Sequence, residues 1–227
     1  MEFLVTLFAQ FLAVTIVITI HEFAHAYSAY KCGDPTAKMM GRMTLNPIKH
    51  FDPLGILMFA LAGFGWAKPV PINPNNFKHY KKGAFWTAIA GVLANYISAF
   101  LFYGLFLLVM LNVYPLVVGK YAEYFVYHFF SGLFVFSLSF CVFNLLPIYP
   151  LDGFRVIESS NMRRGKLYWF LRQNGQYLLF LLIGIHYLAN SVPVLGYFDL
   201  LGYALTFATD IFGKPITLFW NWIFGIL

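Results

Sequence analysis

The chain has 227 residues, of which 60% are hydrophobic, 21% aromatic and 11% charged. Soluble domains carry roughly 25% charged residues, so this composition excludes an ordinary soluble protein and favours a membrane protein. The formal net charge is +6, but no basic stretch is long enough or sufficiently interleaved with aromatic residues to indicate nucleic-acid binding, and membrane topology explains the basic residues better.

The first predicted element is an apolar helix over Phe3–Tyr30, which is long enough to cross a bilayer. It contains the sequence H-E-F-A-H at 21–25, and ionisable groups at such depth usually face a cavity and have a function. His21 and His25 share one face of the helix and can bind one metal ion. Glu22 lies about 100° around the helix, where its carboxylate can reach water at the metal without being a ligand. The alternative is that these side chains only pack between helices.

Three segments, 31–53, 67–82 and 150–166, contain twelve of the fifteen basic residues. The apolar stretch Leu54–Trp66 separates the first two, and it is too short to span, so we predict a re-entrant or interfacial piece. The three basic segments then lie on one side of the membrane, which the positive-inside rule makes cytoplasmic. The histidine motif therefore lies in the cytoplasmic third of the first helix.

A proline-rich segment, Lys68–Asn76, favours an extended backbone. Together with Leu54–Trp66 it is expected to form a small membrane-associated β-hairpin or re-entrant loop, whose edge takes up substrate as an added strand. The alternative is a plain cytoplasmic loop.

Further apolar stretches predict three more spanning helices, at 84–113, 129–146 and 178–189, the last starting near Leu167. Phe198–Leu227 contains Gly213 and Pro215 and predicts a kinked helix or two half-helices. The expected fold is an all-α polytopic membrane protein with about five to six transmembrane segments around a three-helix catalytic core. We expect residues 1–160 to form the catalytic core and 161–227 to form C-terminal transmembrane helices that include a substrate gate.

A catalytic zinc ion needs three protein ligands and leaves a fourth position for water. A third histidine six residues after His25, as in some soluble enzymes, is absent because Lys31 stands there. Asp152 lies beyond two helix-breaking prolines and is followed by Gly153, so its carboxylate can turn back against the helix bundle. Asp152 is therefore the expected third ligand, and a solvated helix cap is the alternative for it.

Four motifs resemble the site-2 protease family of intramembrane zinc metalloproteases, in a compact form without a PDZ-like or nucleotide-sensing CBS module. They are the H-E-x-x-H helix, Trp66-Ala-Lys-Pro-Val-Pro-Ile-Asn-Pro74, Ala90-Gly91-Val-Leu-Ala-Asn95 and Asn144-Leu-Leu-Pro-Ile-Tyr-Pro-Leu-Asp152-Gly153. The resemblance covers about residues 15–160. The family usually has proline where this chain has Val92, which affects only the expected local helix geometry.

The resemblance implies one Zn²⁺ per chain, bound by His21, His25 and Asp152. It implies that Glu22 activates water and that Asn144 helps to hold substrate or the developing oxyanion, while Asn95 matches another polar position close to the site. The implied activity is hydrolysis of peptide bonds within or near transmembrane segments, that is, regulated intramembrane proteolysis of single-span membrane proteins.

The expected location is a prokaryotic plasma membrane with the active site toward the cytoplasm, and a membrane partner is expected to regulate cleavage. Two other functions are open: a membrane metal-ion carrier, because intramembrane His and Asp also mark ion pathways, and a non-catalytic homologue that binds membrane proteins. A carrier has no use for Glu22, and a non-catalytic protein has no use for an intact ligand set and base.

Overall fold

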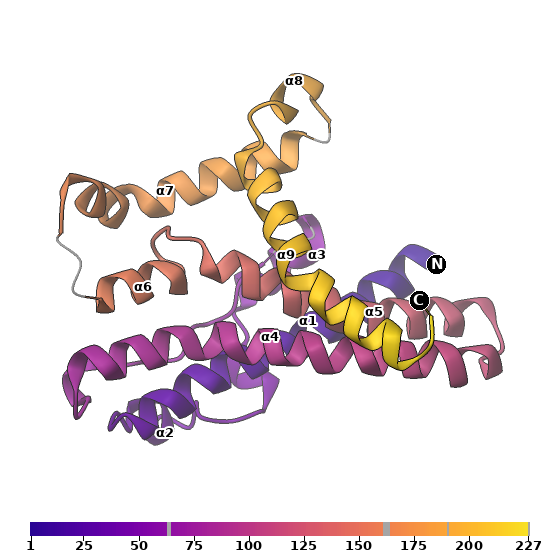
Figure 1. Ribbon diagram of the computed structural model, residues 1–227, viewed down its shortest axis with the longest axis horizontal. Coiled ribbons are helices and arrows are strands. Elements are labelled where there is room, and N and C mark those ends of the chain that lie inside the picture. Colours follow the sequence, from indigo (N-terminus) through magenta and orange to yellow (C-terminus); the bar gives the residue numbers. More distant parts are fainter. Residues whose placement is uncertain (63–64, 161–163, 190, 227) are drawn as a thin grey trace.

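The computed structural model describes residues 1–62, 65–160, 164–189 and 191–226 (Figure 1). These residues are mostly helical, and within them no β-sheet forms, because the one antiparallel bridge, between Phe51 and Ala67, is isolated. The helical class is confirmed. The membrane-associated hairpin is not confirmed.

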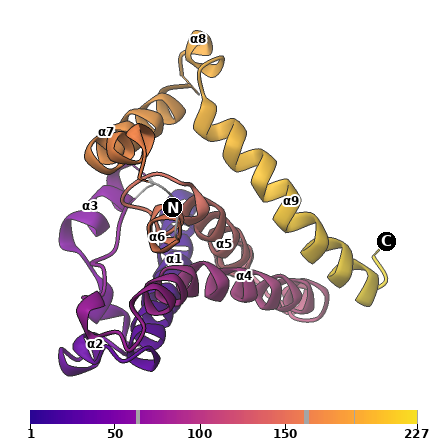
Figure 2. The ribbon, with the colours of Figure 1, turned by 60° about the vertical axis from the view of Figure 1, so that its left-hand side comes forward.

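Three long helices form the centre of the molecule: α1 (Glu2–Lys31), α4 (Tyr80–Asn112) and α5 (Lys120–Leu145). They pack against one another pairwise (Figures 1 and 2). Small residues permit close approach: a Cβ on Gly132 of α5 would lie 3.1 Å from the Cβ of Ala13 in α1, as is common between membrane helices. Among the described residues, these three helices are long and apolar enough to cross a membrane, which indicates a membrane protein.

The chain between α1 and α4 forms short elements at the polar end of α1: α2 (Thr36–Met39), η1 (Pro47–His50), α3 (Pro53–Ala62) and η2 (Pro74–Asn76). With 10 residues, α3 is too short to span the membrane. Residues 63–64, which belong to the predicted re-entrant piece, lie outside the described residues. Between α3 and η2, the segment Ala67–Asn73 contains no helix.

After α5 the chain forms α6 (Asp152–Ser159), α7 (Lys166–Ala189), α8 (Pro193–Gly196) and α9 (Leu200–Ile223). The short helix α6 packs on α4 and α5, and α9 crosses the same two helices (Figure 1). α9 is one helix with Pro215 inside it. The expected five to six spanning segments are not confirmed, and the division at 160/161 stays a prediction, since 161–163 lie outside the described part of the chain.

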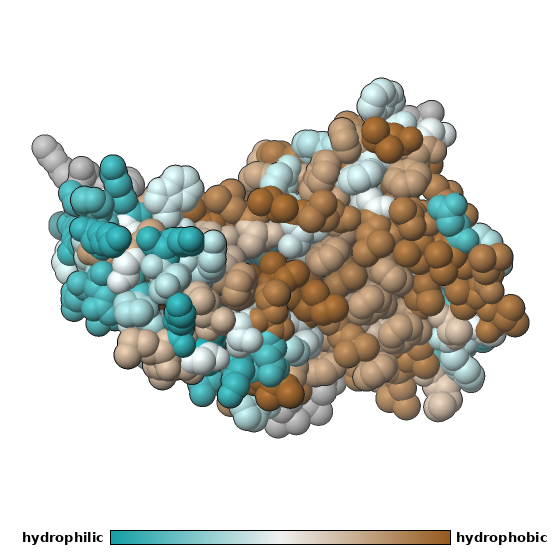
Figure 3. Space-filling model, turned by 90° about the horizontal axis from the view of Figure 1, so that it is seen from below, coloured by the Kyte–Doolittle hydropathy of each residue, from teal (hydrophilic) through white to brown (hydrophobic). Residues whose placement is uncertain are grey.

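One end of the molecule is hydrophilic, while most of the remaining visible surface is apolar (Figure 3). The hydrophilic end is the one at which α4 begins (Figures 1 and 3). α4 has 33 residues, which corresponds to about 50 Å of helix, and the hydrocarbon core of a bilayer is only about 30 Å thick. The first turns of α4 therefore extend beyond the apolar layer.

Tight packing of α9 on α4 gives a first prediction. A Cβ on Gly104 would lie 2.6 Å from the ring of Trp220, whose Nε1 donates to the carbonyl of Phe100 over 2.7 Å. Gly104→Ala is expected to displace α9 and to cost about 1–3 kcal/mol of stability. The control Gly184→Ala has nothing within 4 Å and gains helix propensity. Thermal unfolding in detergent checks this prediction, and equal melting temperatures of the two variants would contradict it.

Candidate metal centre

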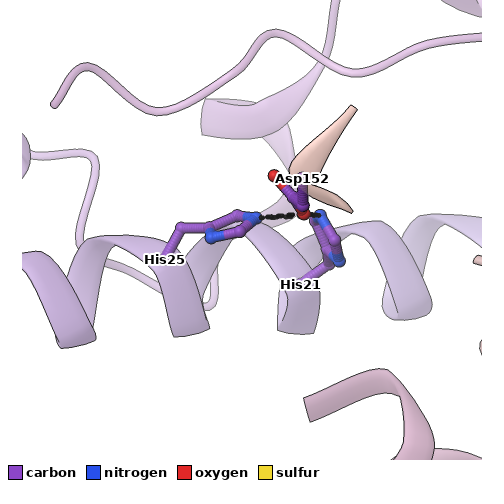
Figure 4. Close-up of side chains that lie close together, drawn as sticks. All are labelled: His21, His25 and Asp152. Atoms are coloured by element: carbon purple, nitrogen blue, oxygen red, sulfur yellow. Dashed lines mark hydrogen bonds and ion pairs between the residues drawn. The ribbon is translucent and has the colours of Figure 1, made fainter. Parts of the chain in front are cut away.

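Two imidazoles and one carboxylate meet at a single buried point (Figure 4). His21 and His25 come from adjacent turns of α1, and Asp152 is the first residue of α6. The two Nε2 atoms lie 3.0 Å apart, and Asp152 Oδ2 lies 3.3 Å from that of His21 and 3.0 Å from that of His25. In a tetrahedral zinc site with bonds of about 2.0–2.1 Å, neighbouring ligand atoms are about 3.3 Å apart. The spacing therefore fits a metal site.

The protonation chemistry of the trio also favours a cation. Asp152 Oδ2 is buried and makes no hydrogen bond in the described part of the structure. Its neighbours are two ring nitrogens that also face each other at 3.0 Å, so a single proton between them cannot satisfy all three atoms. Burying such groups unsatisfied is costly. Two imidazole nitrogens and a carboxylate oxygen are a donor set that suits Zn²⁺.

Neighbouring groups on α4 hold both rings with Nε2 toward the centre. His25 Nδ1 lies 2.7 Å from the carbonyl oxygen of Thr87, to which it donates, so Nε2 keeps its lone pair. His21 Nδ1 lies 3.0 Å from Nδ2 of Asn95, a fully buried residue whose Oδ1 has no partner among the described residues. A 180° flip of this amide turns Oδ1 toward the ring, where it accepts the Nδ1–H of His21. Asn95 thus lies directly behind an expected metal ligand, and any part that it takes in the reaction stays a prediction.

Gly91 explains how α4 can lie directly on the two imidazoles. A Cβ at this position would be 2.5 Å from His25 Nε2 and 2.7 Å from His21 Nδ1. Any side chain here would displace the rings or fill the place of the ion. Val92, the departure from the family motif, is buried in α4, which continues as a regular helix through it.

Asp152 reaches the centre because the chain turns sharply after α5. α5 ends at Leu145, and α6 begins at Asp152 itself. A Cβ on Gly153 would lie 2.3 Å from the carbonyl oxygen of Leu145, so only glycine lets α6 start directly beneath the end of α5. Burial by itself raises the pKa of Asp152, whereas the positive charges of His25 and His21, when these rings are protonated, hold it below its ordinary value.

Glu22 lies beside the metal ligands but is not one of the three converging groups. Its Oε2 accepts a hydrogen bond from the backbone N–H of Val70 over 2.8 Å. Glu22 and Asn144 both line a cavity of about 260 Å³ that also includes the three ligands, called here the metal-site cavity. The side-chain amide of Asn144 donates to the carbonyl of Phe140 over 3.1 Å. The roles expected of Glu22 and Asn144 stay predictions.

Two buried side chains that sequence reasoning did not assign to the site hold the segment that carries Val70. Arg42 Nη2 donates to the carbonyl of Lys68 over 2.7 Å. Asp34 Oδ2 accepts from the backbone N–H of Asn73 over 2.7 Å, and its other oxygen accepts from Asn76. Burial raises the pKa of Asp34, but hydrogen bonds from Thr36, Asn76 and Asn73 outweigh burial and lower that pKa. No sequence motif marks either residue, because their partners are mostly backbone atoms.

The fold and the trio define a helical membrane protein with a metal centre of the zinc-peptidase kind. The sequence profile of peptidase family M50 matches residues 108–183. The candidate zinc metalloprotease YwhC of Bacillus subtilis (strain 168) is 46% identical over 150 residues, which is 65% of this chain and 68% of YwhC. The chain therefore belongs to peptidase family M50, which confirms its resemblance to the site-2 proteases.

More distant relatives match a similar share of this chain but less of their own length. The candidate zinc metalloprotease Rip2 of Mycolicibacterium smegmatis is 29% identical over 146 residues, 62% of this chain and 52% of Rip2. Rip2 of Mycobacterium tuberculosis (strain H37Rv) is 27% identical over 148 residues, 63% of this chain and 53% of that protein. The chain thus spans about half the length of the mycobacterial relatives. No solved structure matches it.

The contact between Asn95 and His21 gives a second prediction. Asn95→Ala removes the group that orients the ring, and such changes typically weaken metal binding 10–100-fold. The control Asn112→Ala lies on the same helix but is exposed, with its amide bonded to the carbonyl of Leu108. Zinc affinity measured by competition with a chromophoric chelator is expected to fall only in Asn95→Ala. Equal affinities of the two variants would show that Asn95 does not orient His21.

Proposed function

We propose that this protein is a zinc-dependent intramembrane endopeptidase that hydrolyses peptide bonds within or near the transmembrane segments of single-span membrane proteins. The observation that carries the proposal is the convergence of Asp152 from α6 with His21 and His25 from α1, a helix apolar enough to cross a membrane, with Glu22 beside them. Membership of peptidase family M50 and the descriptions of YwhC and Rip2 as candidate zinc metalloproteases support it.

Glu22 is the proposed general base. When bound, a zinc ion supplies Lewis-acid chemistry, which lowers the pKa of the attacking water and polarises the scissile carbonyl. Glu22 takes a proton from that water and later gives it to the leaving amine. The N–H of Val70 donates to Oε2 and holds the carboxylate in place. Asn144, which lines the same cavity, is the proposed donor to the developing oxyanion, and losing one such donor typically costs about 2.7–4 kcal/mol in the transition state.

The proposed orientation places the hydrophilic end of the molecule (Figure 3) in the cytoplasm of a prokaryotic cell, with α1, α4 and α5 in the plasma membrane. The excess of basic residues in the segments that meet at this end supports it. Water reaches the metal-site cavity from this side, because that cavity adjoins a polar one near the first turns of α4. Regulation is proposed to come from a membrane partner or from an earlier cut in the substrate.

The segment Ala67–Ile72 is the proposed docking edge for substrate. A helical substrate hides its peptide bonds, so it must be extended locally before cleavage. Ala67, Val70 and Ile72 all line the metal-site cavity, and Arg42 anchors the segment through the carbonyl of Lys68. An extended substrate that pairs with this segment lies beside Glu22 and the metal ligands.

The third prediction separates metal binding from catalysis. Glu22→Gln keeps an acceptor for the Val70 N–H but cannot take a proton, so it is expected to retain zinc and to lose cleavage of a single-span test protein. Asp152→Ala is expected to lose both zinc and activity. Zinc content per chain and a digest with and without a chelator check this, and substantial proteolysis by purified Glu22→Gln would refute the assignment of the base.

The same preparations test the alternative of a metal-ion carrier. Reconstituted in liposomes, the wild-type chain is expected to cleave substrate without moving zinc across the membrane. Zinc flux without cleavage would favour the carrier instead. Zinc binding with neither flux nor cleavage would favour a non-catalytic binding protein.

The fourth prediction concerns the anchor of the docking edge. Arg42→Gln removes a charged hydrogen bond, worth about 1.5–3 kcal/mol, from a buried residue that contacts no metal ligand. We expect kcat/KM to fall at least about tenfold while zinc content is unchanged. The control Lys38→Gln removes an exposed cation bonded to Tyr30 and is expected to keep wild-type turnover. Unchanged turnover in Arg42→Gln would argue against the docking edge.

A further inference from the structure

Three cavities adjoin one another along the docking edge. The metal-site cavity shares Glu22, Asn144 and Ala67 with an apolar cavity of about 400 Å³ between α1, α5, α7 and α9. On its other side it shares Val70, Ile72 and Arg155 with a polar cavity of about 370 Å³. The path of the chain from Ala67 to Pro74 therefore runs from the apolar cavity, past the metal ligands, into the polar cavity.

The polar cavity carries one cation more than it has anions. Its charged lining residues are Arg155, Arg172 and Glu158. Arg172 Nη1 lies 3.2 Å from Glu158, and its guanidinium stacks 4.8 Å above the ring of Tyr149. The pair of Arg172 and Glu158 has no net charge. The lining of the cavity, with two cations and one anion, therefore has a net charge of +1. That charge belongs to Arg155.

The positive charge of Arg155 is only weakly balanced by anionic groups of the protein itself. Its only ion pair among the described residues is with Asp152 Oδ1, at 3.9 Å, and the other oxygen of Asp152 faces the two imidazoles. Thr87 lines the same cavity, and its buried hydroxyl has no hydrogen-bond partner in the described part of the chain. A guanidinium and a hydroxyl that line one cavity can both donate hydrogen bonds to a carboxylate.

We propose that Arg155 is a specificity residue, which selects substrates with an acidic side chain in the polar cavity, on the cytoplasmic side of the scissile bond. This inference rests on the proposed function and names a feature of its substrates. An extended chain advances about 3.3 Å per residue. Val70 and Ile72 of the docking edge line both the metal-site cavity and the polar cavity, and the polar cavity continues to Pro74. The acidic residue therefore lies two or three positions from the cut.

The protein then recognises the substrate on both sides of the scissile bond. Its apolar membrane segment occupies the apolar cavity, and its first acidic residue beyond the membrane pairs with Arg155. Such a pair sets the register of the substrate along the docking edge, and with it the position of the bond that lies beside Glu22. Because the side chain of Arg155 is 44% exposed, the pairing is expected to weaken as the salt concentration rises.

The test uses the zinc-loaded full chain and synthetic single-span peptides that differ at one position. That position, two or three residues from the cut on the polar side, carries Glu, Gln or Lys, and the polar end is extended and amidated so that no terminal carboxylate is near. Cleavage is measured with wild type and Arg155→Glu. Binding is measured by fluorescence anisotropy with Glu22→Gln, alone and combined with Arg155→Glu.

Wild type is expected to prefer the Glu peptide over the Gln peptide by about five- to tenfold in both measurements, as for a partly exposed charged pair. Arg155→Glu is expected to reverse the order and to favour the Lys peptide. A merely structural role of Arg155 cannot produce this reversal, because loss of structure lowers all three signals together. The control Lys82→Gln changes an exposed cation that lines neither cavity and is expected to keep the wild-type order.

Failure of this inference is distinguishable from failure of the proposed function. Cleavage of the three peptides at equal rates by wild type would overturn the role of Arg155 and leave the peptidase intact. Binding that prefers Glu, reversed by Arg155→Glu, with no cleavage by wild type would support the carboxylate site and count against the peptidase. Binding without preference would also overturn the inference.

Discussion

The structure depends on one buried interaction, in which the carboxylate of Asp152 faces the imidazoles of His21 and His25 below the surface of the helix bundle. Such a cluster is stable only when its charges and lone pairs are satisfied. A divalent cation satisfies all three groups at once, and this requirement explains the surrounding features. Gly91 clears space for the rings, Gly153 lets the aspartate turn back, and groups on α4 fix the ring orientation.

The site combines a membrane-embedded scaffold with a polar entrance. α1, α4 and α5 supply the apolar exterior that a bilayer requires, while His21 and His25 lie in the second half of α1, toward Lys31. Hydrolysis needs water, and the metal-site cavity adjoins the cavity near the first turns of α4. The segment held by Arg42 and Asp34 brings backbone groups to the same place, so the proposed base and the proposed docking edge are linked through Val70.

Much of this arrangement was predictable from local sequence, and some of it was not. The helix carrying His21 and His25, the break after α5 and the choice of Asp152 follow from helix periodicity, from prolines and from ligand chemistry. The contacts of Asn95, Thr87 and Arg42 are between segments far apart in the chain and often use backbone atoms, so residue types do not reveal them. The predicted hairpin illustrates the same limit: prolines indicate an extended backbone, but strand pairing depends on a partner that the described residues do not provide.

The most direct test of the account is zinc K-edge X-ray absorption of the purified full chain. The expected spectrum is that of one zinc ion bound by two imidazole nitrogens and by oxygen ligands at about 2.0–2.2 Å. Cys32 and Cys141, both free thiols, should contribute no sulfur. A spectrum with a sulfur ligand, or with fewer than two imidazoles, would contradict the convergence of His21, His25 and Asp152 on one ion.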